Sequence, residues 1–398
     1  MSIPTVSTRA NNTPSSAVRK LVPWAMEAQK RGIKIYHVNI GQPDIPTPKP
    51  IISAIRNYMG PILDYAPSPG LAQTIEAWQI FYKDKNLHFD VKDIIVTSGG
   101  GEGITFSFLA VADPGDEIMV IEPFYTSYAI LAAMGNIKLN PVTTDAHDGF
   151  HLPSRKTIEK SITKKTKAII VCNPNNPTGT VYTDEEVKML SEIAIKHNLF
   201  IISDEPYQEM VFEGRKVLPF ASIKKLERNL IVIDSVSKRF NACGARIGCL
   251  ASKNPDIISS VLRFAMGRLS VATVEQIAVI PLLTNHRSYV EKVRKIYEGR
   301  RKVVIDQLQK IPGVNFIPSY GAFYIIPQIP VKDSEDFAKY LLTDFSHNNE
   351  TVMAAPAGGF YATAGMGKNE IRIAYVLEEK KLKRAIELLG LALKKYNN

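Results

Sequence analysis

Short hydrophobic runs alternate with amphipathic segments along the chain up to about residue 250. The hydrophobic runs are rich in β-branched residues and predict strands at residues 94–97, 117–121, 167–172, 199–203, 230–235 and 247–251. Between them, apolar residues recur with helical spacing, for example over residues 102–112 and 184–197. This alternation favours an α/β fold with a mostly parallel sheet covered by helices on both faces. Ligands of such sheets bind beyond the carboxyl ends of the strands.

The two ends of the chain predict a smaller unit in which helices and strands are mixed. Before the sheet, residues 16–31 have helical spacing and residues 33–40 have the pattern of a strand. Pro46, Pro48 and Pro50 follow, and we expect no helix or central strand to cross them. The remaining predictions are helices at 256–266, 274–283 and 287–310, strands near 322–327 and 370–374, and a final helix from Glu379.

Composition and charge exclude several other architectures and partners. The 398 residues are 45% hydrophobic and 22% charged, which excludes a chain that is mainly disordered, collagen-like or coiled coil. The formal net charge of +10 comes from 49 basic and 39 acidic residues that are interspersed, as at residues 378–381. Such mixing indicates solvated helix faces, so we expect no nucleic-acid partner.

The apolar segments and the cysteines bear on the cellular compartment. No apolar stretch approaches the roughly 18 residues that a membrane span needs, and the N-terminal residues contain no apolar signal core. We therefore expect a cytoplasmic protein without a membrane partner. Cys172, Cys243 and Cys249 form no CxxC pair, which predicts neither a disulfide framework nor a metal site. We expect all three to be reduced, packed thiols.

A polar segment with candidate chemistry follows the predicted strand at residues 230–235. It contains Ser235, Ser237 and Lys238, and Arg246 comes eight residues after the lysine. Hydroxyls and a guanidinium suit a phosphate group, and a lysine amine can form a Schiff base with a carbonyl. Taken alone, the lysine and the arginine would equally fit an ordinary surface loop.

Three further segments also follow predicted strands. Residues 173–179 are rich in Asn, Pro and Gly, which by itself indicates a turn. Asp204 ends an apolar run, a position where an acidic residue most often caps a helix or turn. The glycines at 99–101 precede a predicted helix and suit an anion at its N-terminus, although their spacing is not that of a dinucleotide-binding fingerprint.

In combination, these segments resemble the fold-type I, class I/II aminotransferases of the aspartate aminotransferase-like superfamily, which use pyridoxal phosphate (PLP). The matching motifs are Ser-x-Ser-Lys with Gly-x-Arg-x-Gly, Asn-Pro-x-Asn-Pro-x-Gly, and Asp-x-x-Tyr, and they occur in the order typical of the family. The resemblance extends from about Gly41 to beyond Arg372. One departure lies at residues 70–73, where relatives often have an arginine soon after the glycine, and it leaves the subfamily open.

The resemblance implies a role for each matching residue. Lys238 would bind PLP as a Schiff base and move the proton, and Asp204 would keep the pyridine nitrogen protonated, as an electron sink requires. Asn176 and Tyr207 would donate to the phenolic oxygen. The other implied cofactor contacts are Gly100, Gly101, Ser235, Ser237 and Arg246 to the phosphate and Tyr125 stacked on the ring; a core aromatic residue is the alternative for Tyr125.

Three positions concern the substrate and a second subunit. Arg372 matches the arginine that binds the substrate α-carboxylate, for which the alternative is a buried salt bridge. Gly41 matches a glycine that lies against the substrate. Tyr65 matches the tyrosine that reaches the phosphate of the neighbouring subunit, so a homodimer with composite sites is implied.

The implied fold has a seven-stranded sheet and three parts. They are an N-terminal arm with part of the small domain (1–45), the large PLP-binding domain (46–286), and a long interdomain helix with the α+β small domain (287–398). The implied activity is ping-pong transfer of an amino group from an L-amino acid to a 2-oxo acid such as 2-oxoglutarate or pyruvate.

The donor stays open among aspartate, aromatic and aliphatic amino acids. Gly101 stands where some aspartate-specific relatives have a lysine, which lowers the case for a dedicated aspartate enzyme. Arg268 lies where other relatives send an arginine into the partner's site. We treat a contact between Arg268 and a distal carboxylate as a hypothesis and favour a surface or dimer salt bridge.

Other functions use the same features. A PLP-dependent lyase, such as a C–S lyase or an enzyme like ACC synthase, would need the same cofactor residues. A non-catalytic module of a transcription regulator would need an attached DNA-binding domain, which the sequence does not suggest. A dinucleotide enzyme built on the glycine run would not need Lys238.

Overall fold

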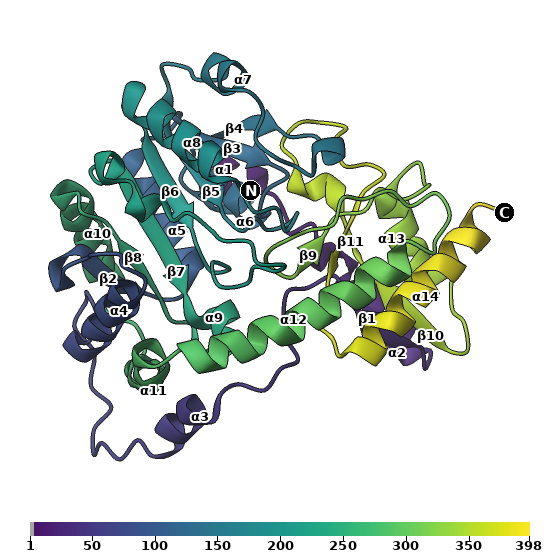
Figure 1. The fold of residues 1–398 in the computed structure, drawn as a ribbon, viewed down its shortest axis with the longest axis horizontal. Helices are drawn as coiled ribbons and strands as arrows, with labels where there is room; N and C mark the ends of the chain where they lie inside the picture. Colours follow the sequence, from purple (N-terminus) through teal and green to yellow (C-terminus); the bar gives the residue numbers. More distant parts are fainter. Residues whose placement is uncertain (1–3) are drawn as a thin grey trace.

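A seven-stranded sheet forms the centre of the computed structural model, which describes residues 4–398 (Figure 1). The strands lie in the order β2 (Ile94–Thr97), β8 (Gly248–Ala251), β7 (Leu230–Ser235), β6 (Phe200–Asp204), β5 (Thr166–Cys172), β3 (Glu117–Glu122) and β4 (Lys138–Thr143). Neighbours from β7 to β4 are parallel, and β8 runs antiparallel to both strands beside it. The expected mostly parallel α/β sheet is confirmed.

The sheet is buried on both faces because residues in each strand alternate between two cores. In β7, Ile231 and Ile233 pack into one core and Val232 packs into the other. The core with the isoleucines includes residues of α5 (Gly100–Val111), α6 (Ser127–Met134) and α10 (Pro255–Arg268). The core with Val232 includes residues of α3 (Lys49–Arg56), α4 (Ala72–Asp84), α7 (Arg155–Lys160), α8 (Asp184–Lys196) and α11 (Thr273–Thr284).

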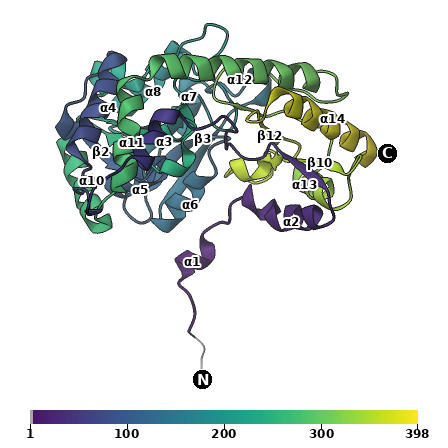
Figure 2. The same ribbon diagram turned by 90° about the horizontal axis from the view of Figure 1, so that it is seen from below.

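A smaller unit combines the start of the chain with its last third. Its helices are α2 (Val22–Lys30), α12 (Arg287–Leu308), α13 (Ser334–Thr343) and α14 (Glu379–Tyr396). Strands β11 (Ala355–Pro356), β12 (Ile371–Ala374) and β9 (Tyr324–Ile325) form one sheet, and β1 (Lys34–His37) pairs in parallel with β10 (Glu350–Met353). Figure 2 shows α12 running along the molecule and α1 (Thr8–Asn12) on the N-terminal segment that leads away from its body. The boundaries at residues 45 and 286 stay a prediction.

Prolines lie at two places in the fold that the sequence pattern did not resolve. Strand β4 was not predicted from its polar sequence with Pro141 inside, but β4 is an edge strand, where a missing N–H donor is tolerated. Helix α3 begins at Lys49 with Pro50 in its first turn, so it starts within the proline segment and does not cross the three prolines. First-turn N–H groups have no intrahelical acceptor, and proline is therefore compatible with that position.

Among residues 4–398, no helix combines the length and the apolar character that crossing a membrane requires.

Candidate active site

A cavity of about 480 Å³ lies where the carboxyl ends of the central strands meet the smaller unit. Every site residue expected from the sequence except Tyr65 lines this cavity: Gly41, Gly100, Gly101, Tyr125, Asn176, Asp204, Tyr207, Ser235, Ser237, Lys238, Arg246 and Arg372. Parallel strands place their following loops at one edge of the sheet, which brings residues from distant parts of the chain together.

Lys238 lies on α9 (Val236–Arg239), a single helical turn directly after β7. Ser235 caps this turn by accepting a hydrogen bond from the Ser237 N–H. The Lys238 Nζ donates to the Gly41 carbonyl at 2.7 Å and lies 3.7 Å from the Cys243 Sγ. Cys243 is partly exposed and lines the cavity, so it is not the packed thiol that we expected, whereas Cys172 and Cys249 are buried.

A set of hydrogen-bond donors at one end of the cavity fits a phosphate group. Helix α5 begins at Gly100, so the N–H groups of Gly100 and Gly101 belong to its first turn and point toward the positive end of the helix dipole. The Ser235 Oγ donates to the Ser237 Oγ at 2.8 Å. Arg246 completes the set, and its Nη2 would lie 2.6 Å from a Cβ atom at Gly99. The φ of +76° at Gly99 favours glycine there.

Asp204 is buried at the end of β6 and lines the cavity. The Tyr128 hydroxyl donates to its Oδ2 at 2.6 Å. Burial raises the pKa of Asp204 to about 6, although the bond from Tyr128 opposes this shift. A cationic nitrogen in the cavity would favour the ionised carboxylate, so this environment fits the protonated pyridine ring of PLP.

The opposite end of the cavity contains a buried arginine without a carboxylate partner. The Arg372 Nη1 donates to the Asn176 Oδ1 at 3.0 Å and the Nη2 to the Asn39 carbonyl at 2.6 Å. Among residues 4–398, the Nε has no hydrogen-bond partner, and no salt bridge to Arg372 occurs. Burial without a counter-ion lowers the pKa of Arg372. The guanidinium therefore fits an anionic ligand better than a buried salt bridge.

Tyr207 and Tyr324 line the cavity from the central sheet and from the smaller unit, respectively. The hydroxyls of Tyr207 and Tyr324 lie 3.1 Å apart, where one donates to the other. A Cβ atom at Gly41 would lie 1.9 Å from the Tyr324 hydroxyl, so only glycine allows this approach. The sequence analysis singled out Gly41 by resemblance but did not identify Tyr324.

Sequence reasoning missed two other residues of functional interest. Tyr128 lies one helical turn after Tyr125, but no sequence signal showed that its hydroxyl reaches Asp204. Arg19 lines the cavity from the N-terminal segment, and its side chain takes part in no hydrogen bond or salt bridge with residues 4–398. Only the fold places this exposed arginine beside the central sheet.

Tyr65, and Arg268 with its hypothetical role, lie outside the cavity. Tyr65 is 80% exposed on the segment between α3 and α4, and Met59, Ile62 and Leu63 on the same segment are also exposed. Its implied role requires a second subunit and stays a prediction. The Arg268 Nη2 donates to the Ser68 carbonyl at 3.1 Å, and its Nε lies 3.5 Å from the Glu102 Oε1. A contact between Arg268 and a partner's substrate also stays a hypothesis.

The chain is similar to known enzymes over nearly its whole length. Residues 33–389 match the family model "Aminotransferase class I and II". An aspartate aminotransferase of Pyrococcus horikoshii is 31% identical over 95% of this chain and 94% of that protein. An aspartate aminotransferase of Bacillus subtilis is 30% identical over 97% of this chain and 98% of the relative.

Solved structures show the same similarity. An aspartate aminotransferase of Thermus thermophilus with maleate superimposes with a TM-score of 0.89 at 27% identity, covering 98% of this chain and 100% of that chain. An N-succinyldiaminopimelate aminotransferase of Mycobacterium tuberculosis has a TM-score of 0.88 at 26% identity, with coverage of 98% and 100%. The chain therefore belongs to the class I and II aminotransferases, enzymes that use pyridoxal phosphate.

Proposed function

We propose that this aminotransferase takes the amino group of an L-amino acid and passes it to a 2-oxo acid in the cavity around Lys238. The observation that supports the assignment best is the convergence of one lysine, one buried carboxylate, a set of phosphate-binding donors and one unpaired arginine on the same cavity. The names of the relatives do not favour a lyase, because those that we compared are aminotransferases.

The residues around the cofactor bind its ring and keep the ring nitrogen charged. Bound PLP supplies an electron sink for the pair of electrons left when the substrate carbon loses its proton. Asp204 would hold the ring nitrogen in its charged form, and Tyr128 donates to that carboxylate and orients it. Asn176, Tyr207 and Tyr125 would hold the ring, the first two through its phenolic oxygen.

Lys238 and Arg372 act on the substrate. The Lys238 Nζ moves the proton between the substrate carbon and the cofactor, because it lies inside the cavity at the carbonyl of Gly41. Arg372 binds the α-carboxylate through the side of the guanidinium that carries the unpartnered Nε. This contact orients the substrate and thereby selects which of its bonds is broken.

Aspartate is the first donor to test. Four cationic side chains line the cavity, namely Arg19, Lys238, Arg246 and Arg372, and three of them are assigned to the cofactor or the α-carboxylate. Arg19 is left without an anion, so a second carboxylate on the substrate would complement it. Two relatives that cover nearly the whole chain are named aspartate aminotransferases, which supports the same choice.

The active assembly that we propose is a homodimer in the cytoplasm. Tyr65 contributes to the phosphate site of the partner subunit, and its exposure beside Met59 and Leu63 supports an interface at this segment.

A spectrum of the half-reaction tests the proposed function. Purified, PLP-loaded protein receives aspartate, alanine, leucine, phenylalanine or cysteine singly, without a 2-oxo acid, while the visible band of the cofactor is recorded. We expect the band to bleach with a donor and to return when 2-oxoglutarate is added. A band that persists while ammonia and a 2-oxo acid accumulate would show lyase chemistry instead.

A further inference from the structure

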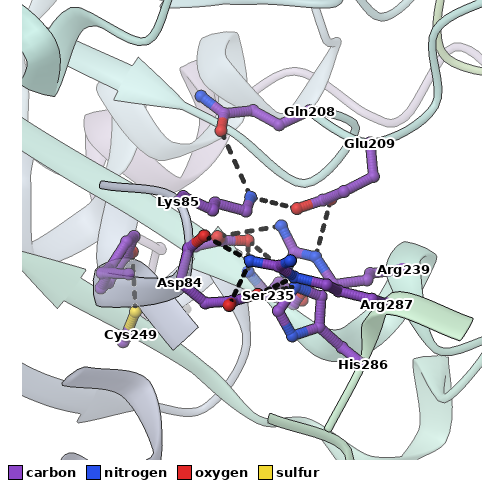
Figure 3. Close-up of polar contacts among 11 residues, drawn as sticks. Asp84, Lys85, Gln208, Glu209, Ser235, Arg239, Cys249, His286 and Arg287 are labelled. Atoms are coloured by element: carbon purple, nitrogen blue, oxygen red, sulfur yellow. Dashed lines mark hydrogen bonds and ion pairs between the residues drawn. The ribbon is translucent and has the colours of Figure 1, made fainter. Parts of the chain in front are cut away.

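Four charged side chains form a cluster with a buried centre, next in sequence and in space to the turn that carries Lys238. Figure 3 shows three of them, Lys85, Glu209 and Arg239. The cluster consists of Arg239, Asp234, Glu209 and Lys85. The Arg239 side chain is 0% exposed and that of Asp234 is 1% exposed. Two positive and two negative charges balance within the cluster. None of these residues lines the cavity or matches a motif that the sequence analysis assigned to the site.

Arg239 bonds to both carboxylates at once. Its Nη1 and Nη2 donate to the two Asp234 oxygens at 2.8 and 3.0 Å. Its Nε donates to the Glu209 Oε2 at 2.7 Å, and Lys85 forms an ion pair with the other oxygen of Glu209. The guanidinium also lies 4.4 Å from the centre of the Phe81 ring. The planar fork of an arginine can satisfy all these contacts together.

The cluster connects two segments of the active site through their neighbours in sequence. Arg239 directly follows Lys238, and its Nη1 also donates to the Ser235 carbonyl at 3.3 Å. The Asp234 Oδ1 accepts from the Ser235 N–H at 2.6 Å. Glu209 lies two residues after Tyr207, on the loop that leaves β6. The Arg239 guanidinium thus joins the loop of Tyr207 to the turn of Lys238.

Helix α9 needs such an anchor because it is only four residues long. A single turn cannot hold itself, since its nucleation costs more than its few hydrogen bonds return. Ser235 caps the N-terminal side of the turn, and Arg239 anchors its last residue. Neighbouring residues of α9 therefore project in different directions: Lys238 lines the cavity, and Arg239 enters the buried cluster.

We propose that Arg239 is a positioning residue for the reaction. By pairing with Asp234 and Glu209, it fixes the Lys238 amine and the Tyr207 hydroxyl relative to each other where both meet the cofactor. This inference rests on the proposed role of Lys238. It assigns Arg239 no contact with substrate or cofactor.

The test uses the variant Arg239→Lys in the PLP-loaded full chain. Lysine keeps the positive charge, but its single nitrogen on a shorter side chain cannot reproduce the planar pairing of two arginine nitrogens with Asp234 and of the third with Glu209. We expect kcat to fall at least about tenfold while KM for the amino donor stays within about threefold, because the substrate contacts are intact. We also expect the pH midpoint of the visible cofactor band to shift by about half a unit or more, since that midpoint reports the environment of the Lys238 nitrogen.

Arg287→Lys is the matched control. Arg287 also forms a two-bonded pair with a carboxylate, that of Asp84, but its side chain is 73% exposed (Figure 3). We expect wild-type kcat and a wild-type midpoint for this control. A folded, PLP-loaded Arg239→Lys variant that also shows wild-type kcat and midpoint would overturn the proposal.

A second variant keeps the proposal testable if Arg239→Lys does not fold. Glu209→Gln retains an oxygen that accepts from the Arg239 Nε but removes the charge on the Tyr207 side of the cluster. We expect the same two changes in smaller size, and a wild-type midpoint with wild-type kcat would contradict the proposal. Borohydride reduction of the wild-type protein distinguishes failure of this proposal from failure of the proposed function. The absence of a PLP adduct at Lys238 would refute the proposed function itself.

Discussion

Arg372 and Asn176 are joined by a hydrogen bond of 3.0 Å, although they lie 196 residues apart in sequence. The arginine is on β12 of the smaller unit, and the asparagine is on the loop after β5 of the central sheet. The bond holds the proposed carboxylate-binding group against the proposed cofactor-binding group. This contact predicts that substrate binding and cofactor binding are coupled across the cavity between the two units.

Replacing Arg372 with lysine should weaken substrate binding without removing the cofactor. A lysine has one nitrogen in place of the three separate guanidinium nitrogens that face Asn176, the Asn39 carbonyl and the proposed carboxylate, so it cannot keep this geometry. Loss of one charge-assisted bond predicts a fall in kcat/KM of about tenfold to a hundredfold. Steady-state kinetics with several donors measures the fall, and an unchanged visible spectrum without substrate serves as the control. Equal kcat/KM in both proteins would contradict the role of Arg372.

Lys238→Ala should remove the covalent link to PLP and nearly all turnover. We expect kcat to fall by about a thousandfold or more, because both the nucleophile and the proton carrier are lost. Mass spectrometry after borohydride reduction should find the adduct on wild-type protein and not on the variant. Lys253→Ala, which removes a partly exposed lysine paired with Glu227, should behave as wild type. Turnover that survives in Lys238→Ala would favour chemistry that does not use this lysine.

Asp204 should make the stability of the cofactor-free protein depend on pH. Burial raises its pKa from 3.8 to about 6, so the folded protein holds this proton more tightly than the unfolded chain does. The contribution of Asp204 is then complete below about pH 4 and decreases as the pH rises through 6, by on the order of 3 kcal/mol.

Urea unfolding of wild type and Asp204→Asn at pH 4 and pH 7 measures this effect. The asparagine variant cannot titrate at this position, so other groups cancel in the difference between the two proteins. We expect the stability of wild type relative to the variant to fall between the two pH values. A difference that stays constant, or that rises with pH, would show that the Asp204 pKa is not raised.

Arg19→Gln should lower the activity toward acidic donors selectively. The loss of a partly solvated charge contact predicts a decrease in kcat/KM for aspartate and glutamate of roughly three- to tenfold. The kcat/KM for alanine should stay within about twofold of the wild-type value, because alanine has no distal carboxylate that Arg19 could contact.

Arg268→Ala tests the alternative arginine for a distal carboxylate. Unchanged turnover of aspartate and glutamate in Arg268→Ala would reject its hypothetical role.

Subunit mixing tests the composite site that Tyr65 implies. Lys238→Ala and Tyr65→Ala should each lose activity, but a mixed dimer of the two contains one site with both wild-type residues. After subunit exchange in an equal mixture, activity should recover to about a quarter of wild type. Mixed protein that stays as inactive as its components, with exchange verified by mass spectrometry, would show that Tyr65 does not act across an interface.

The sequence alone determined the central strands and the motifs that end them. Strands β2 and β7 begin and end where the hydrophobic pattern predicts, because buried strands consist of short continuous apolar runs. Asp204 ends one such strand, and Asn176 and Lys238 come a few residues after the ends of two others, so strand prediction and family resemblance together placed them at one edge of the sheet. Apolar runs and short motifs each depend on a few consecutive residues, so the sequence of that segment is enough to predict them.

Only the tertiary structure decided which distant side chains meet. Edge strand β4 carries a polar pattern because one side of it has no neighbouring strand, and it was not predicted. Tyr128 and Arg239 look like ordinary helix residues in sequence. Their partners, Asp204 and Glu209, come from other segments of the fold. Burial excludes water from these groups, and a charge or hydroxyl without water needs a protein partner, which only the packing of the chain provides.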